Sequence, residues 1–322
     1  MQVREIKVNE ERKEIRNHGT FEFPIAVYQT QLNKNILGFV NWHWHDELQF
    51  CLVVKGTVSV FLNQRTVTLR KGQGIFINSG VLHMSREEPG TDGTYICIDF
   101  SSRLLSSFPN SAVDRKYVLP VINSRNIDAV VLDPDSERQR DILERLQKVN
   151  DLYESGAYGY ELEICSHLNM IWSDILSVIR AETGTDAGVQ NDLENLKTVG
   201  GGPNQIHQQR LRDIVTYIEK HFEEPIALGD ISHHVHLSVS ECCRFFKKNM
   251  NCTIFDYLTE FRIGKSIGLL TETNMTVSRI AYETGFGSSS YFIEKFKSKM
   301  GMTPNAYRRK ITENTCDGSP RI

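Results

Sequence analysis

The sequence predicts an α+β protein of more than one domain, in which an N-terminal β-barrel with an attached helical segment precedes an all-α domain. Three observations predict this. Short apolar runs broken by Gly, Asn and Pro fill residues 21–100, which is typical of a barrel or sandwich. The apolar period becomes helical over 136–181. Residues 206–310 are helical by pattern and contain an internal repeat.

Composition and charge narrow the class of protein. Hydrophobic residues make up 40% and charged residues 24% of the chain, which is ordinary for a globular protein. No apolar run of about 18 residues is present, and the charged N-terminus lacks the apolar core of a signal peptide. The seven cysteines form no CxxC pair, so we expect a reducing, cytoplasmic setting. The whole chain has a net charge of −3, but residues 206–310 hold 15 Lys and Arg against 11 Asp and Glu. An acidic N-terminal part therefore precedes a mildly basic C-terminal part.

The N-terminal region contains five segments with the pattern of strands. They are Leu48–Val54, Thr57–Leu62, Thr66–Leu69, Gly74–Ile77 and Thr94–Phe100. Two helical stripes follow, formed by Ile142, Leu146, Val149 and Tyr153, and by Leu162, Cys165, Leu168, Trp172, Ile175 and Ile179. The second stripe has the spacing of a coiled coil, so we expect it to join two copies in a homodimer. The alternative is that it packs on its own barrel.

The domain boundary falls where large apolar residues become scarce. Residues 182–205 are poor in them and include Gly200-Gly201-Gly202-Pro203, a composition that favours a flexible linker. We therefore expect a barrel domain over 1–183, a linker over 184–205, a helical domain over 206–311 and a tail over 312–322.

The helical domain repeats one supersecondary unit. Leu228–Ser232 returns as Val277–Ala281, and the later positions of the unit return after one additional residue. Each copy has a short helix, a tight turn and a longer helix. Ser238 and Ser288 stand where N-caps are expected, and Gly285 can supply a positive φ in the second turn. A helix of about 254–270 would separate the copies. Two such units suit adjacent major-groove faces of B-DNA, which recur about every 34 Å; the alternative is a plain helical bundle with solvated lysines.

The repeat also carries a family resemblance. The domain resembles the DNA-binding domain of AraC-type (arabinose-regulator-like) transcription factors. The residues that carry it are Ile231-Ser232, Leu237-Ser238, Phe246-Lys247-Lys248, Phe255-x-x-Leu258, Phe261-Arg262-Ile263, Ile280-Ala281, Gly285-Phe286, Ser290-Tyr291-Phe292, Phe296-Lys297 and Gly301-x-x-Thr303-Pro304-x-x-Tyr307-Arg308. Cys242 and Ser232 depart from the usual Leu and Ala, and Gly264 and Gly268 weaken the central helix.

The resemblance implies which side chains face DNA. Those expected to read bases are Ser240, Cys243 and Arg244 in the first unit and Ser289, Ser290, Ile293 and Glu294 in the second. Arg244 can bind guanine O6 and N7, and Glu294 can accept from cytosine N4; the alternative for each is an ordinary solvated charge. The side chains expected to meet phosphates are Lys247, Lys248, Lys297 and Lys299.

The barrel region contains its own polar constellation. His43, His45 and Gln49 share one face if they lie on one strand, and His83 comes from a neighbouring strand. Three histidines in this arrangement are able to form a facial metal site. The pattern resembles the two motifs of cupin barrels, but Gln49 replaces the carboxylate ligand and Asn78 the usual Pro. We therefore expect no metal and no other cofactor, and expect the four side chains to contact a small-molecule effector; the alternative is plain barrel packing.

The whole architecture resembles that of AraC-type regulators. The resemblance implies a sequence-specific regulator, not an enzyme, that binds double-stranded DNA as a homodimer, contacts RNA polymerase and responds to a small molecule such as a sugar or related metabolite. Two other classes stay open. One is a cupin metalloenzyme with a DNA-binding appendage. The other is a constitutive DNA binder whose barrel only dimerises.

Overall fold

The structure is a computed structural model that describes residues 6, 8–9, 12–15, 18–34, 39–62, 65–88, 90–106, 108–124, 126–183, 203–250 and 252–309. Its internal contacts divide the chain into an N-terminal unit, Met1–Gln209, and a C-terminal unit, Arg210–Ile322. The tail expected over 312–322 and residues 184–202 of the expected linker lie outside the described part. Helix α5 begins at Pro203, three residues before the helical domain was expected to begin, because Pro is favoured in the first helical turn.

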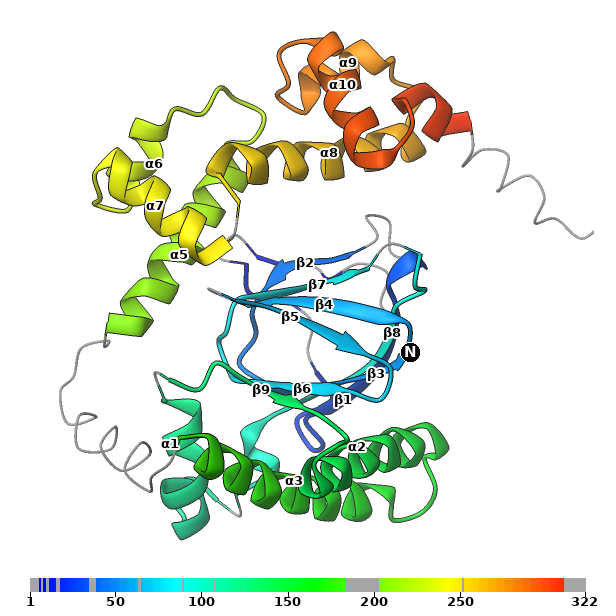
Figure 1. The fold of residues 1–322 in the computed structure, drawn as a ribbon, viewed down its shortest axis with the longest axis vertical. Coiled ribbons are helices and arrows are strands. Elements are labelled where there is room, and N and C mark those ends of the chain that lie inside the picture. Colours follow the sequence, from blue (N-terminus) through cyan, green and yellow to red (C-terminus); the bar gives the residue numbers. More distant parts are fainter. Residues whose placement is uncertain are drawn as a thin grey trace, which may run out of the picture. The chain divides into compact units, whose positions relative to one another are not determined.

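The N-terminal unit is built on two antiparallel sheets that form the predicted barrel (Figure 1). The five-stranded sheet has the order β1 (Ile25–Gln31), β8 (Thr94–Phe100), β3 (Leu48–Lys55), β6 (Gly74–Ile77) and β9 (Ala129–Leu132). The four-stranded sheet has the order β2 (Phe39–His43), β7 (His83–Glu87), β4 (Thr57–Leu62) and β5 (Arg65–Arg70). The five predicted strands are β3, β4, β5, β6 and β8, with bounds that agree to within one residue.

The five-stranded sheet is buried on both faces. On β3, Leu48, Phe50 and Leu52 belong to the core shared with the helices, whereas Cys51 and Val53 belong to the core inside the barrel. Strand β8 alternates in the same way. Side chains that alternate along these two strands therefore separate a purely apolar outer layer from an interior that also holds polar groups.

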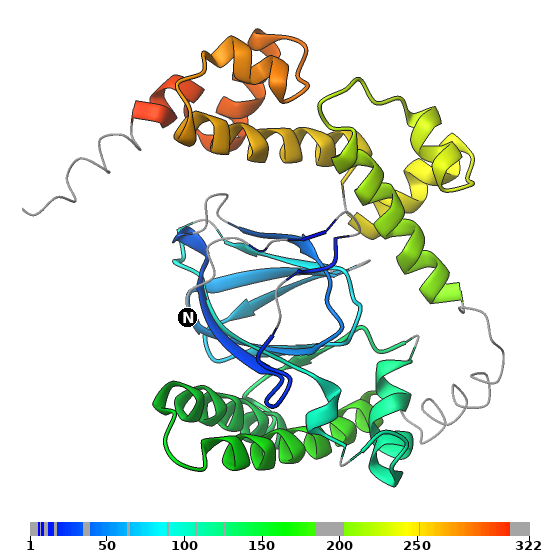
Figure 2. The same ribbon diagram turned by 180° about the vertical axis from the view of Figure 1, so that it is seen from behind.

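A helical layer covers the outer face of the five-stranded sheet (Figures 1 and 2). Its main members are α2 (Glu137–Ser155) and α3 (Tyr160–Thr183). The shorter helices of this unit are η1 (Leu32–Lys34), η2 (Ser102–Leu104), η3 (Asp114–Val118) and α1 (Leu119–Ile122). Helices α2 and α3 pack on each other, and α2 also contacts β3, β8 and β9.

The expectation that the second apolar stripe forms a free dimer seam is wrong for most of its residues. Leu168, Trp172, Ile175 and Ile179 are buried in the core between the helices and the sheet. The ring of Trp172 lies 5.8 Å from that of Phe76 on β6. The physical reason is that the outer face of the sheet is itself apolar, and α3 supplies part of its cover. Leu162 at the start of the stripe is 76% exposed.

The C-terminal unit begins within α5 (Pro203–Lys220). The helices that follow are α6 (Leu228–His234), α7 (Val239–Met250), α8 (Ile254–Glu272), α9 (Val277–Glu283) and α10 (Ser289–Met300), and then helical residues 304–309. The turns after α6 and α9 each contain a backbone hydrogen bond at the equivalent position. Leu237 N–H donates to the Ser232 carbonyl and Phe286 N–H to the Ala281 carbonyl, each at 2.9 Å. The predicted repeat is thus present in the backbone hydrogen bonding.

None of the helices in the described ranges has the length and apolar character needed to cross a membrane.

Candidate functional site

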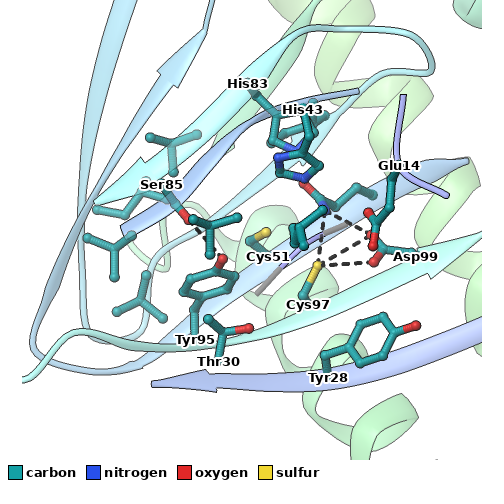
Figure 3. Close-up of a pocket in the computed structure, with 18 residues that line it drawn as sticks. Glu14, Tyr28, Thr30, His43, Cys51, His83, Ser85, Tyr95, Cys97 and Asp99 are labelled. Atoms are coloured by element: carbon teal, nitrogen blue, oxygen red, sulfur yellow. Dashed lines mark hydrogen bonds between the residues drawn. The ribbon is translucent and has the colours of Figure 1, made fainter. Parts of the chain in front are cut away.

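A cavity lies inside the barrel, with walls formed by strands of both sheets (Figure 3). One part of its wall is aliphatic, formed by Ile6, Val40, Val53, Val58, Val60, Leu69 and Ile77. The remaining lining residues carry polar or sulfur atoms and are Glu14, Tyr28, Thr30, His43, Gln49, Cys51, His83, Ser85, Tyr95, Cys97 and Asp99. A cavity with an apolar wall and a few convergent polar groups is the usual form of a small-molecule site.

Three histidines meet at one end of this cavity. The single strand expected over 43–49 is wrong, because β2 ends at His43, β3 begins at Leu48, and a bend separates them. The bend nevertheless turns His45 inward. Ligand nitrogens of His43, His45 and His83 all lie within 4.8 Å of one another, and Gln49 Nε2 lies 3.4 Å from His45 Nε2. The four side chains predicted to share one site are thus brought together and buried.

Backbone carbonyls hold the three imidazole rings in place. The Nδ1 atom of His43 lies 2.7 Å from the Asn41 oxygen, that of His45 lies 3.1 Å from the Glu47 oxygen, and that of His83 lies 2.8 Å from the Val81 oxygen. Burial lowers the pKa of His83 to about 4 and the pKa of His43 and of His45 well below the usual range, with the neighbouring imidazoles adding to the effect for His43 and His45. The three rings are therefore neutral at neutral pH.

A second polar group beside the histidines combines Glu14, His18, Gln49 and Asp99. The Nε2 of His18 lies 3.3 Å from Glu14 Oε2, its Nδ1 lies 3.4 Å from Asp99 Oδ2, and Gln49 Nε2 donates to Asp99 Oδ1 at 2.9 Å. Burial raises the pKa of Asp99 to about 6. Burial alone would lower the pKa of His18, but the hydrogen bond to Glu14 and the two carboxylates raise it to about 9.

Sequence reasoning missed these acids. Asp99 was visible as a charge on an otherwise apolar strand, in the same alternation as Tyr95 and Cys97, which also line the cavity. Glu14 precedes the first strand, in a segment without a periodic pattern, so nothing in the sequence placed it near the barrel interior. Asn78 plays a structural part: its Nδ2 donates to the carbonyls of Val121 at 2.7 Å and Ile127 at 2.9 Å.

The first helix-turn-helix unit presents the expected residues on one outer face of α7. Cys242 and Phe246 are buried on the inner face. Ser240 and Arg244 are exposed and Cys243 is half-buried, and Lys247 and Lys248 at the end of the helix are exposed. The predicted N-cap at Ser238 is confirmed, because its Oγ accepts from Glu241 N–H at 3.3 Å while Ser238 N–H donates to Glu241 Oε2 at 3.1 Å.

The second unit has the same design on α10. Phe292 and Phe296 are buried, whereas Ser290, Ile293 and Glu294 are exposed, Ser289 is half-buried, and Lys297 is exposed. Ser288 caps the helix by accepting from Tyr291 N–H at 3.4 Å, and Gly285 has the expected positive φ, +73°. Lys299, also expected to meet phosphates, has its Nζ 2.7 Å from Glu260 Oε1 on α8.

Comparison with known proteins identifies the family of both parts of the chain. Residues 36–166 match the family model described as an AraC-like ligand binding domain, and residues 231–310 match a helix-turn-helix domain. The chain is 34% identical over 302 residues to the HTH-type transcriptional regulator YdeC of Bacillus subtilis (strain 168), covering 94% of this chain and 97% of that protein. It is 26% identical over 272 residues to YfiF of the same organism, covering 83% and 78%.

A solved structure is also similar over the C-terminal unit. The C-terminal domain of the two-component response regulator yesN from Fusobacterium nucleatum subsp. nucleatum is 34% identical, with a TM-score of 0.29, covering 30% of this chain and 93% of that one. The resemblance to AraC-type regulators is thus confirmed by family models and by a relative that matches nearly end to end. The chain belongs to the AraC family of DNA-binding transcription regulators and carries a ligand-binding domain ahead of its helix-turn-helix domain.

Proposed function

We propose that α7 and α10 each enter a major groove of duplex DNA and that a small molecule held in the barrel cavity controls this binding. The observation that carries the proposal is the matching design of the two helices, each buried along one face and open along the other. The proposed base readers are Ser240, Cys243, Arg244, Ser289, Ser290, Ile293 and Glu294. The proposed phosphate contacts are Lys247, Lys248 and Lys297, with Lys299 available only after it leaves Glu260.

The cavity supports an effector with both apolar and hydroxyl groups. Its aliphatic wall suits an apolar face such as that of a sugar ring. His43, Gln49 and His83 line part of its polar end, and the buried His45 lies beside them. Ser85 and Tyr95, whose oxygens lie 2.8 Å apart, form another polar pair inside the barrel. A ligand that satisfies such buried groups gains affinity, because a buried polar group left unpaired costs about 1–3 kcal/mol.

Family membership supports the remaining proposals. We propose that the protein is not an enzyme and that it acts in the cytoplasm as a homodimer that contacts RNA polymerase. For a dimer, the exposed Leu162 and Met170 on α3 are better candidates than the buried residues of the same helix, because they are open to a partner.

The DNA half of the proposal is tested with the full-length protein and a DNA site selected from a random library. Arg244→Ala should weaken binding to the preferred site by about 1–3 kcal/mol and relax base preference at one position. Lys297→Ala, the matched control, should weaken all sequences alike and reduce the salt dependence of binding. Fluorescence anisotropy against several salt concentrations measures both effects. An unchanged base preference in Arg244→Ala would show that α7 does not read this position.

The sensor half is tested by a metabolite screen on the same protein. An effector that binds only the folded state stabilises it by about 2.7 kcal/mol at a hundred times its Kd, so it raises the melting temperature. The same compound must also change the affinity for DNA, because a ligand with equal affinity for both states shifts nothing. A compound that binds the barrel and leaves DNA affinity unchanged would favour a constitutive DNA binder instead.

A further inference from the structure

We propose that the barrel binds a divalent transition-metal ion of the zinc class on the three imidazoles of His43, His45 and His83. The three rings come from β2, from the bend after it and from β7, and a cross-strand pair joins His43 to His83. All three side chains are buried, and their ligand nitrogens lie within 4.8 Å of one another. A cluster that gathers three potential ligands from separate segments in this way is a preformed donor set.

The hydrogen bonds of the three rings indicate which nitrogen of each ring is able to bind a metal. Each Nδ1 is directed at a backbone carbonyl, and since a carbonyl only accepts, each Nδ1 carries the ring proton. Each Nε2 is then the unprotonated nitrogen, which is the form that binds a metal. A backbone acceptor on the far nitrogen is also what fixes metal-binding histidines in general. Nε2 of His83 is buried without a hydrogen-bond partner among the described residues, so a bound cation would satisfy it.

The structure answers the sequence argument against a metal, which rested on Gln49 in place of an acid. The Gln49 amide donates to Asp99 Oδ1 at 2.9 Å, and that same oxygen lies 4.0 Å from His45 Nε2. A buried carboxylate from the neighbouring strand, β8, therefore lies beside the three imidazoles although position 49 carries an amide. Glu14 is a second buried acid that lines the cavity. Two buried acids, Glu14 and Asp99, therefore lie near the three imidazoles.

The donor set also indicates the class of metal. Three imidazoles suit zinc, copper, iron or nickel better than magnesium or calcium, which prefer oxygen ligands. Zinc with three protein ligands keeps a fourth coordination position for water or an added ligand. His43 and His83 line the cavity, so that position would be within reach of a molecule bound there.

The first test uses the full-length protein stripped of metal by a chelator that is then removed. Zinc titrated by calorimetry should bind with one high-affinity site per chain. Cobalt(II), used as a spectroscopic substitute, should show visible ligand-field bands without the near-ultraviolet charge-transfer band of a cobalt–thiolate bond. Absence of saturable binding overturns the proposal. A thiolate band also overturns it, because the ion would then sit on a cysteine.

Variants identify the ligands. His43→Ala and His83→Ala should each weaken zinc binding by more than the 10–100-fold loss that is typical for an outer-shell partner. His167→Ala, which removes a histidine of α3 outside the cluster, should bind as the wild type does. Affinity retained in both cluster variants overturns the assignment. If a variant fails to fold, the cobalt spectrum of the wild-type protein still decides. The titration needs no DNA, so its failure is distinct from failure of the proposed regulation.

Discussion

The turns of the two helix-turn-helix units each contain one residue with a positive φ at the equivalent position, but the residue differs between them. In the second turn Gly285 has a φ of +73°, and a Cβ there would lie 2.3 Å from the Phe222 carbonyl oxygen. In the first turn His236 occupies the equivalent place with a φ of +54°. A left-handed conformation costs a residue with a Cβ about 1–2 kcal/mol, although His tolerates it better than branched residues do. His236 is exposed, so its ring offers little packing in return.

His236→Gly should therefore stabilise the C-terminal unit by about 0.5–1 kcal/mol, which is the relief of strain less the larger chain entropy of glycine in the unfolded state. Gly285→Ala is the matched opposite and should destabilise it by more than that, since both the φ and the Phe222 carbonyl oppose a Cβ. Urea unfolding of a fragment beginning at Pro203 measures both. A loss of stability in His236→Gly would mean that the imidazole makes a contact worth more than the strain.

Individual site residues were predictable only in part. The spacing of His43, His45 and Gln49 with His83 predicted that they would meet, and they do, although the strand assumed to carry them is interrupted by a bend. The acids beside them were not predicted. Glu14 reaches the cavity through a segment whose path is set by tertiary contacts, such as the hydrogen bond from Glu14 N–H to the Trp44 carbonyl at 2.9 Å. No local pattern encodes such a contact.

At the scale of elements, helix α8 joins the two helix-turn-helix units and is held at both ends. Its N-terminus has a capping box formed by Thr253 and Asp256. Near its C-terminus, Arg308 Nε donates to the Leu270 carbonyl at 3.1 Å and Arg308 Nη2 donates to the Met275 carbonyl at 2.6 Å. One guanidinium thus ties the end of α8 to the segment before α9, where the carbonyls have no helical partner.

Arg308→Ala should destabilise the C-terminal unit by about 1.5–3 kcal/mol, the usual effect of losing hydrogen bonds from a charged donor to partly buried acceptors. Arg308→Lys should recover only part of the loss, because an ammonium lacks the planar fork that reaches two carbonyls. Arg309→Ala is the control, because Arg309 is the next residue along the chain and its side chain is exposed. Urea unfolding midpoints compare the three, and equal midpoints for Arg308→Ala and Arg309→Ala would contradict the bracing role.

Strands were predictable where their pattern was distinctive. β4 and β6 were predicted with their observed bounds because turn residues flank short apolar runs. β7, His83–Glu87, was expected only as a strand that carries His83, without bounds, because it is largely polar. β9, Ala129–Leu132, was missed because four apolar residues before a long helix cannot be assigned from periodicity alone. Each joins a sheet through partners distant in sequence, β2 and β4 for the first and β6 for the second.

At the scale of the whole molecule, the sequence predicted the order and class of the domains but not the partner of every apolar face. A helical stripe shows that one side of a helix avoids water, and it does not say what covers that side. The α3 stripe was expected at a dimer seam, yet Leu168 and Ile175 are 1% and 0% exposed within their own unit. The outer face of the five-stranded sheet, which no local pattern revealed, accounts for the difference.

Ile175→Ala separates these two roles of α3. If the side chain is core, truncation should lower the free energy of unfolding by about 2–5 kcal/mol and leave the mass measured by light scattering at its wild-type value. The three tryptophans, Trp42, Trp44 and Trp172, all lie in the N-terminal unit, so their fluorescence follows the unfolding of that unit alone. Leu162→Ala, at the exposed end of the same stripe, is the control and should change stability by less than about 0.5 kcal/mol. The opposite result would be an Ile175→Ala variant that is as stable as the wild type but monomeric where the wild type is a larger assembly. That result would show that the stripe forms a dimer interface.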